Sequence, residues 1–137
     1  MHSFSRNEMR RFFFDVWEKH LNKAPLEPLE LQLLEIMQEH PEYHPFLNNQ
    51  EKYQEYDFTD ENPFLHMSLH LALIEQIKLN RPPGIRDIYQ QLFKKIPVKQ
   101  DVEHRMLLCL ADMLTEVQKT GAPPNEEKYL TALKRLV

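Results

Sequence analysis

Apolar residues recur at intervals of three and four along most of this sequence, and this helical spacing is the feature that most restricts the fold. One stripe near the start consists of Met9, Phe12, Phe13, Val16, Trp17 and His20. A second consists of Leu29, Leu33, Ile36 and Met37. Such spacing puts one apolar face on a helix, whereas a strand needs alternation with a period of two. No alternation lasts long enough to predict a strand, so the predicted fold class is all-α.

Capping residues, prolines and glycine set the expected helix boundaries. Ser5 with Glu8 forms a capping box, and Phe4 with Met9 forms a hydrophobic staple. Asn62 followed by Pro63 opens a helix, and prolines after residue 40 close one. The helices are predicted at about 5–21, 28–39, 49–55, 63–79, 85–96, 102–117 (closed by Gly121) and 126–135 (capped by Asn125).

A chain of 137 residues has the size of one domain and can bury one core without disulfides or metals. No internal repeat or low-complexity linker interrupts it. We therefore expect residues 1–137 to form a compact single-domain array of about six or seven helices. Only 2 glycines occur, which argues against Gly-rich phosphate loops, and neither nucleotide-binding fingerprint is present.

The charge is uneven along the chain. The formal net charge is −4, which argues against nucleic acid and against an anionic membrane as the main partner. Residues 1–77 carry 6 Lys and Arg against 14 Asp and Glu, whereas residues 78–137 carry 11 against 7. Such asymmetry is typical of solvated or complementary surfaces.

The sequence predicts a cytoplasmic location. Its first residues, MHSFSRNEMRR, lack the basic and then apolar pattern of a signal peptide. No apolar run approaches the roughly 20 residues of a membrane span. Cys109 is the only cysteine and has no partner for an internal disulfide. It lies on an apolar stripe, where a thiol is usually inert packing.

Two histidines stand one turn apart in the segment NPFLHMSLHLALIEQ. Because residues i and i+4 lie on one face of a helix, His66 and His70 are predicted to point into the core together. The apolar stripe of 28–39 extends to His40, and His44 follows shortly after. We therefore expect these imidazoles to gather between the helices 28–39 and 63–79.

Inward imidazoles on neighbouring helices can build a metal site. The metalloprotease motif is absent, because Met67 stands where its glutamate is required. No Glu-x-x-His pair of the di-iron kind occurs either. A mononuclear zinc or iron site with ligands from His40, His44, His66 and His70 is the remaining metal hypothesis. The alternatives are neutral core histidines bonded to carbonyls or hydroxyls, or acid-base catalysis.

Two other segments offer weaker candidates. Arg10 and Arg11 adjoin aromatic residues in RRFFFDVW, which could contact bases or phosphates, but an aromatic stripe at helical spacing favours a core role. The acidic stretch EYDFTDE lacks the alternating oxygen ligands and the central glycine of an EF-hand. We expect it to be a solvated loop.

The motifs RRFFFDVW, HPEYH, NPFLHMSLHLALIEQ and PPGIR, in this order, resemble a proteobacterial family catalogued as domain of unknown function 1841. The resemblance covers nearly the whole chain. It implies a single helical domain in a small cytoplasmic bacterial protein. The family has no known activity, cofactor or catalytic residue, so the resemblance assigns no role to His40, His44, His66 or His70.

Two functional hypotheses follow from the residues. The first is a helical protein that binds an unknown protein or small molecule at the histidine-lined patch, and the absence of an activated nucleophile favours such a role over catalysis. The second is the mononuclear metal site, with a hydrolytic role if water fills an open position. The sequence leaves monomer and homodimer open, because Met67 and Leu71 are apolar flanks that a small core need not cover.

Overall fold

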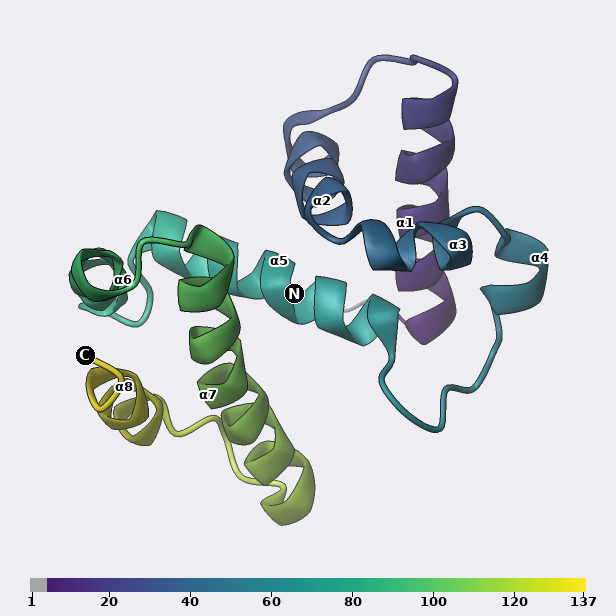
Figure 1. Ribbon diagram of the computed structural model, residues 1–137. Coiled ribbons are helices and arrows are strands. Elements are labelled where there is room, and N and C mark those ends of the chain that lie inside the picture. Colours follow the sequence, from purple (N-terminus) through teal and green to yellow (C-terminus); the bar gives the residue numbers. More distant parts are fainter. Residues whose placement is uncertain (1–4) are drawn as a thin grey trace. The chain divides into compact units, whose positions relative to one another are not determined.

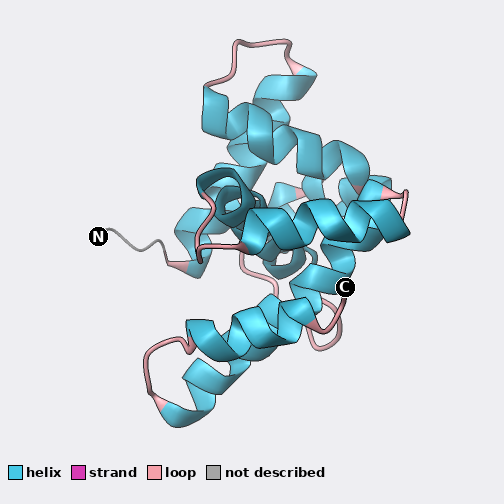
Figure 2. Cartoon of the chain, turned by 90° about the vertical axis from the view of Figure 1, so that its left-hand side faces the viewer, coloured by secondary structure: helices cyan, strands magenta, loops and turns pink. Residues whose placement is uncertain are grey.

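The computed structural model describes residues 5–137, which form helices joined by loops (Figure 1). This part of the chain contains eight α-helices and one 3-10 helix, and it contains no strand (Figure 2). The predicted all-α class is confirmed, whereas the predicted number of six or seven helices is too low. By its internal contacts the chain divides into two compact units, one ending at Ser68 and the other spanning Leu69–Val137. The single domain over 1–137 stays a prediction.

Six helical elements lie wholly or partly in the first unit. They are α1 (Arg6–Leu21), α2 (Pro28–Glu39), the 3-10 helix η1 (Pro41–Tyr43), α3 (His44–Leu47), α4 (Gln50–Tyr53) and the beginning of α5 (Pro63–Leu79). The predicted start of α1 is correct because the Oγ of Ser5 accepts a hydrogen bond from the backbone N–H of Glu8 at 3.2 Å. The predicted contact of Phe4 with Met9 lies outside the described residues.

The additional helices lie where the sequence analysis placed only helix-ending prolines. Pro41 ends α2, yet it also occupies the first position of η1, and Pro45 lies in the first turn of α3. Proline is well accommodated at such positions because its missing N–H would have no partner there and its φ angle is already helical. Pro41 therefore stops α2 and starts η1, whereas Pro45 lies within the start of α3.

The core of the first unit combines the inner faces of its helices with the first turns of α5. Its buried apolar residues are Phe13, Phe14, Val16, Trp17, Leu33, Leu34, Ile36, Met37, Tyr43, Leu47, Phe64 and Met67. Two details differ from the predicted stripes. Phe14 is buried although the predicted stripe of α1 does not include it, and Leu29 is half exposed. Leu29 occupies the first turn of α2, and burial along this face begins one turn later, at Leu33.

Polar contacts anchor the first turn of α2. Glu27 and Glu30 form a capping box, in which the Glu30 carboxylate accepts a hydrogen bond from the backbone N–H of Glu27 at 2.8 Å. The other Glu30 oxygen accepts from Lys19 of α1, also at 2.8 Å. The carboxylate of Glu30 therefore joins the start of α2 to α1.

Arg10 of α1 is buried, at 2% exposure. Its guanidinium donates hydrogen bonds to backbone carbonyls of the segment 53–56 and lies over the rings of Phe58 and Phe64. Arg11 is exposed. In this arrangement Arg10 serves the first unit as a structural cation.

The second unit contains the remainder of α5 followed by α6 (Ile85–Lys95), α7 (Lys99–Thr120) and α8 (Glu126–Lys134). Gly121 ends α7 with φ +71°, as predicted. The Oδ1 of Asn125 caps α8 by accepting from the N–H of Lys128 at 3.0 Å. The core of this unit consists of Leu73, Ile85, Ile88, Leu92, Val102, Met106, Leu107, Leu110, Tyr129 and Leu133.

Two further observations bear on possible partners. Met67, one of the two flanks that kept a homodimer open, is fully buried. Met67 is therefore not an uncovered apolar residue, because its face of α5 belongs to the core. Among the helices of residues 5–137, none combines the length and the apolar character that crossing a membrane requires.

Candidate metal centre

His40 occupies the C-terminal end of α2. The helix ends there because proline disfavours the helical conformation of the residue before it, and His40 has φ −124° and ψ 66°. Its ring is buried, at 3% exposure, and stacks on the ring of Tyr43 with centroids 5.2 Å apart. The Nδ1 atom lies 2.9 Å from the carbonyl oxygen of Ile36. The apolar stripe of α2 thus continues to His40, as the sequence predicts.

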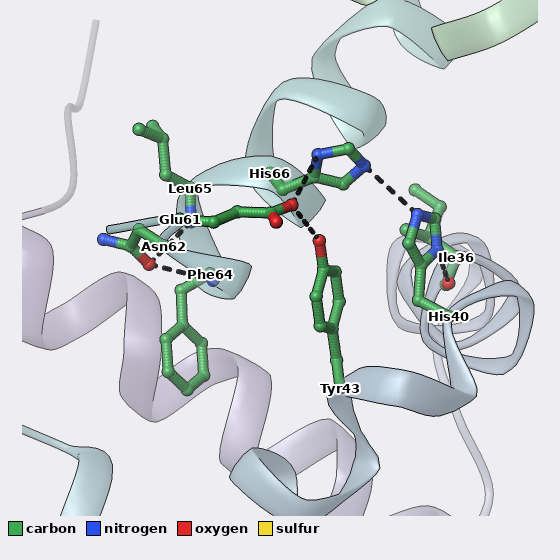
Figure 3. A network of polar contacts seen from close by, with 8 residues as sticks. All are labelled: Ile36, His40, Tyr43, Glu61, Asn62, Phe64, Leu65 and His66. Atoms are coloured by element: carbon green, nitrogen blue, oxygen red, sulfur yellow. Dashed lines mark hydrogen bonds and ion pairs between the residues drawn. The ribbon is translucent and has the colours of Figure 1, made fainter. Parts of the chain in front are cut away.

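His66 lies near the start of α5 and meets His40 through its ring (Figure 3). The start of the helix is fixed by Asn62, whose Oδ1 accepts from the backbone N–H groups of Phe64 at 3.0 Å and Leu65 at 3.1 Å. The Nε2 atoms of His40 and His66 are 3.1 Å apart. The prediction that α5 directs an imidazole toward the end of α2 is confirmed for this residue.

The partners of the two rings limit where their protons lie. A carbonyl oxygen only accepts, so the Nδ1 of His40 carries hydrogen, and in the neutral ring Nε2 then holds the lone pair. His66 turns its Nδ1 toward the Glu61 carboxylate, 3.9 Å away. If the two Nε2 atoms share a hydrogen bond, His66 donates it. A neutral His66 would then direct its own Nδ1 lone pair at a carboxylate, which is unfavourable.

Two arrangements avoid that conflict. In one, His66 is an imidazolium that donates from both nitrogens. In the other, a cation lies between two Nε2 lone pairs, and both rings keep hydrogen on Nδ1. Metal-binding histidines typically direct their second nitrogen to a carbonyl or a carboxylate in this way. Two nitrogens bound tetrahedrally to zinc at 2.0–2.1 Å lie roughly 3.3 Å apart, close to the observed 3.1 Å.

Tyr43 and Glu61 complete the surroundings of the pair. The Tyr43 hydroxyl donates to the Oε1 of Glu61 at 2.7 Å, the same oxygen that faces His66. Burial, together with this carboxylate, raises the pKa of Tyr43 above its ordinary value, so the hydroxyl stays protonated. Glu61 is therefore held near the outer nitrogen of His66. The side chain of His66 is about a quarter exposed (26%), which leaves water a route to the pair.

His44 is directed elsewhere. Its Nε2 donates to the carbonyl oxygen of Met37 at 2.8 Å, and its ring packs on Trp17 with centroids 4.6 Å apart. Trp17 itself donates to the Oδ1 of Asn48 at 2.7 Å. The structure thus brings His40 and His66 together and leaves His44 in a separate contact with α1.

Comparison with protein families identifies one family that this chain matches. The model of one family, described as "Domain of unknown function (DUF1841)", matches residues 5–135, nearly the whole sequence. The chain belongs to the DUF1841 family. The resemblance seen in its motifs is therefore confirmed. Comparison with curated proteins gave no match, and neither did comparison with solved structures.

In the second unit of this DUF1841 protein, His70 contacts an acidic partner. His70 is fully buried, and its Nε2 lies 2.5 Å from the Oε1 of Glu103 on α7. The hydroxyl of Tyr89 donates to the other oxygen of Glu103 at 2.7 Å. Burial by itself raises the pKa of Glu103, but the hydrogen bonds from His70 and Tyr89 outweigh it, so this pKa lies below its ordinary value. Glu103 is thus a buried carboxylate anion.

Sequence reasoning missed Glu103, although a signal for it was present. Glu103 precedes Met106, Leu107 and Leu110 by three, four and seven residues, and all three are buried. It therefore lies on the apolar face of α7. A carboxylate in that position needs a buried partner. The two histidines predicted to point inward from α5 were candidates for that partner.

Cys109 is a partly buried thiol on α7. Burial raises the pKa of its thiol, and the nearby Asp112 acts in the same direction. It lines a cavity of about 440 Å³ between α7 and α8, together with Tyr129 and others. A thiol that stays protonated is a poor nucleophile, so Cys109 is no candidate for covalent chemistry.

Proposed function

We propose that this DUF1841 protein binds a zinc ion through the Nε2 atoms of His40 and His66. One observation carries the proposal. The two Nε2 atoms converge to 3.1 Å while each Nδ1 faces an oxygen acceptor, a carbonyl for His40 and a carboxylate for His66. This is the orientation that neutral imidazole ligands adopt around a metal.

The donor set favours zinc over iron and over hard cations. Imidazole nitrogen suits zinc, copper, iron and nickel, whereas magnesium and calcium prefer oxygen ligands. Non-haem iron sites usually add a carboxylate to two histidines. The carboxylate of Glu61 instead faces the Nδ1 of His66, on the other side of the ring from Nε2. Glu61 therefore acts as an outer partner that orients the imidazole.

Two protein ligands leave coordination positions for water or for other donor groups. The proposed function is therefore metal binding at the histidine-lined patch of the first unit. This patch consists of His40, Tyr43, Glu61 and His66. The competing explanation is a structural hydrogen bond from a cationic His66 to His40. That explanation needs no metal and predicts no response to one.

Metal analysis and zinc titration distinguish the two explanations. The protein is purified without a histidine tag, its metal content is measured, and zinc affinity is determined by competition with a chromogenic chelator. His66→Gln and His40→Gln remove one ligand each. His44→Gln is the matched control, because it removes a neighbouring imidazole that is directed at Met37.

We expect stoichiometric zinc in the wild-type protein and in the His44→Gln variant. Each ligand variant should lose at least the roughly 10–100-fold in affinity that removal of an outer partner already costs. Zinc at about 100 times its Kd should stabilise the fold by about 2.7 kcal/mol and raise Tm by on the order of 10 °C. A wild-type protein that neither retains zinc nor changes its melt would contradict the proposal. So would His66→Gln with unchanged affinity.

A further inference from the structure

The buried carboxylate of the second unit has its own chemical consequence. Glu103 is fully buried in α7, and both of its oxygens are engaged, one by His70 and one by Tyr89. Lys99 lies 3.9 Å from it and is half exposed. Because the carboxylate only accepts hydrogen bonds, the Nε2 of His70 must carry hydrogen.

We propose that His70 is a metal-binding residue that coordinates zinc through Nδ1, with Glu103 as the positioning residue that fixes its tautomer. In a neutral imidazole with hydrogen on Nε2, the lone pair lies on Nδ1. A buried carboxylate on the outer nitrogen is the arrangement that holds and activates histidine ligands in zinc proteins. Glu103 thus faces the outer nitrogen of His70, as the Ile36 carbonyl and the Glu61 carboxylate face the outer nitrogens of His40 and His66.

A second imidazole lies beside His70 within the same unit. His104 follows Glu103 on α7, and its ring centroid is 5.8 Å from that of His70. The ligand atoms of the two histidines lie within 4.8 Å of each other, and His104 is half buried. Two nitrogens on one zinc ion can be at most about 4.2 Å apart, so binding one ion requires the ring of His104 to bring a nitrogen within that distance of the Nδ1 of His70.

Other uses of the buried pair fit the structure less well. A catalytic histidine has to reach a substrate, and His70 has no exposed surface. A cation is small enough to be enclosed by such side chains, and neutral imidazole is its common ligand. This inference rests on the proposed function only for the identity of the ion, zinc. Its ligands, His70 and His104, are not among those of the proposed function.

The test combines spectroscopy on the wild-type protein with a matched pair of variants. Protein labelled with ¹⁵N at histidine is titrated with zinc chloride, and the imidazole nitrogens are followed in two-bond ¹H–¹⁵N spectra. We expect the Nδ1 signal of His70 to move from a lone-pair to a metal-bound position while its Nε2 stays protonated. The zinc affinity read from the Nδ1 signal of His70 should be about 10–100-fold lower in Glu103→Gln. Glu116→Gln, on the exposed part of α7, should leave it unchanged.

The wild-type spectra keep the inference testable even if Glu103→Gln fails to fold. An Nδ1 signal of His70 that is unaffected by zinc would overturn the inference, as would equal affinities of the two glutamine variants. Failure of the proposed function has a different signature, in which the Nε2 signals of His40 and His66 do not respond. The His104→Gln variant should also bind zinc more weakly than Glu116→Gln, and equal binding would remove His104 from the ligand set.

Discussion

Replacement of Arg10 by methionine should destabilise the first unit far more than the same replacement of Arg11. The Nη1 of Arg10 donates to the carbonyl oxygens of Tyr53 at 3.1 Å, Gln54 at 3.4 Å and Tyr56 at 2.6 Å. These three acceptors lie at the end of α4 and in the segment that connects it to α5. Methionine preserves much of the volume of the side chain but provides no donor, so the segment loses its attachment to α1.

The magnitude follows from the contacts. Two of the three hydrogen bonds are short, and a hydrogen bond from a charged group contributes about 1.5–3 kcal/mol. The guanidinium carbon also lies 5.1 Å from the ring centre of Phe64 and 5.3 Å from that of Phe58, each worth about 0.5–1 kcal/mol. Burial offsets part of this gain, since it lowers the pKa of Arg10, and water can reach the released carbonyls. We expect a net loss of about 2–4 kcal/mol.

Urea unfolding followed by Trp17 fluorescence and by circular dichroism measures this loss. With an m value of about 1–3 kcal/mol/M, Arg10→Met should lower the midpoint by on the order of 1 M or more. Arg11→Met is the control, because its exposed side chain predicts a change within about 0.5 kcal/mol. Arg10→Lys keeps the charge without the planar fork and should fall between them. Coincident midpoints for the two methionine variants would show that the contacts of Arg10 do not stabilise the first unit.

Two further predictions concern stability alone. The hydrogen bonds from Lys19 and from the backbone of Glu27 hold the pKa of Glu30 below its ordinary value. The stability that the Glu30 carboxylate contributes is therefore present above its unfolded-state pKa. This stability is lost as the pH falls through the lower pKa of the folded state. Glu30→Gln should therefore flatten the fall in Tm between about pH 5 and pH 3, and a slope like that of the exposed-site variant Glu35→Gln would count against it. Gly121→Ala should cost about 1 kcal/mol in chemical denaturation, since φ is +71° with no atom within 4 Å of an added Cβ. An unchanged midpoint would show that α7 does not depend on this left-handed residue.

Local signals explain which parts of the fold could be predicted from the sequence. The start of α5 depends on Asn62 and Pro63, and the end of α7 depends on Gly121, so each boundary is determined by a few adjacent residues. The short helices after His40 were missed because proline has two opposite effects, which depend on whether the next turn is helical. Propensity alone does not decide between them.

Only two members of the candidate site, His40 and His66, could be predicted from the sequence, whereas Tyr43 and Glu61 could not. The stripe of α2 correctly led to His40, and helical spacing correctly placed His66 opposite it. The direction of His44 depends on the turn through η1, which directs its ring to Trp17. The partner of His70 lies 33 residues away on α7. Such a contact depends on how α5 and α7 pack, and only the apolar neighbours of Glu103 hinted at it.

The central claim, that His40 and His66 bind a metal, is tested most directly by diffraction from crystals grown with zinc. Anomalous data collected on both sides of the zinc absorption edge locate the ion without reference to the protein. We expect a peak about 2.0–2.1 Å from the Nε2 atoms of both residues. A map with no peak there, and with the two nitrogens still in hydrogen-bond contact, would contradict it.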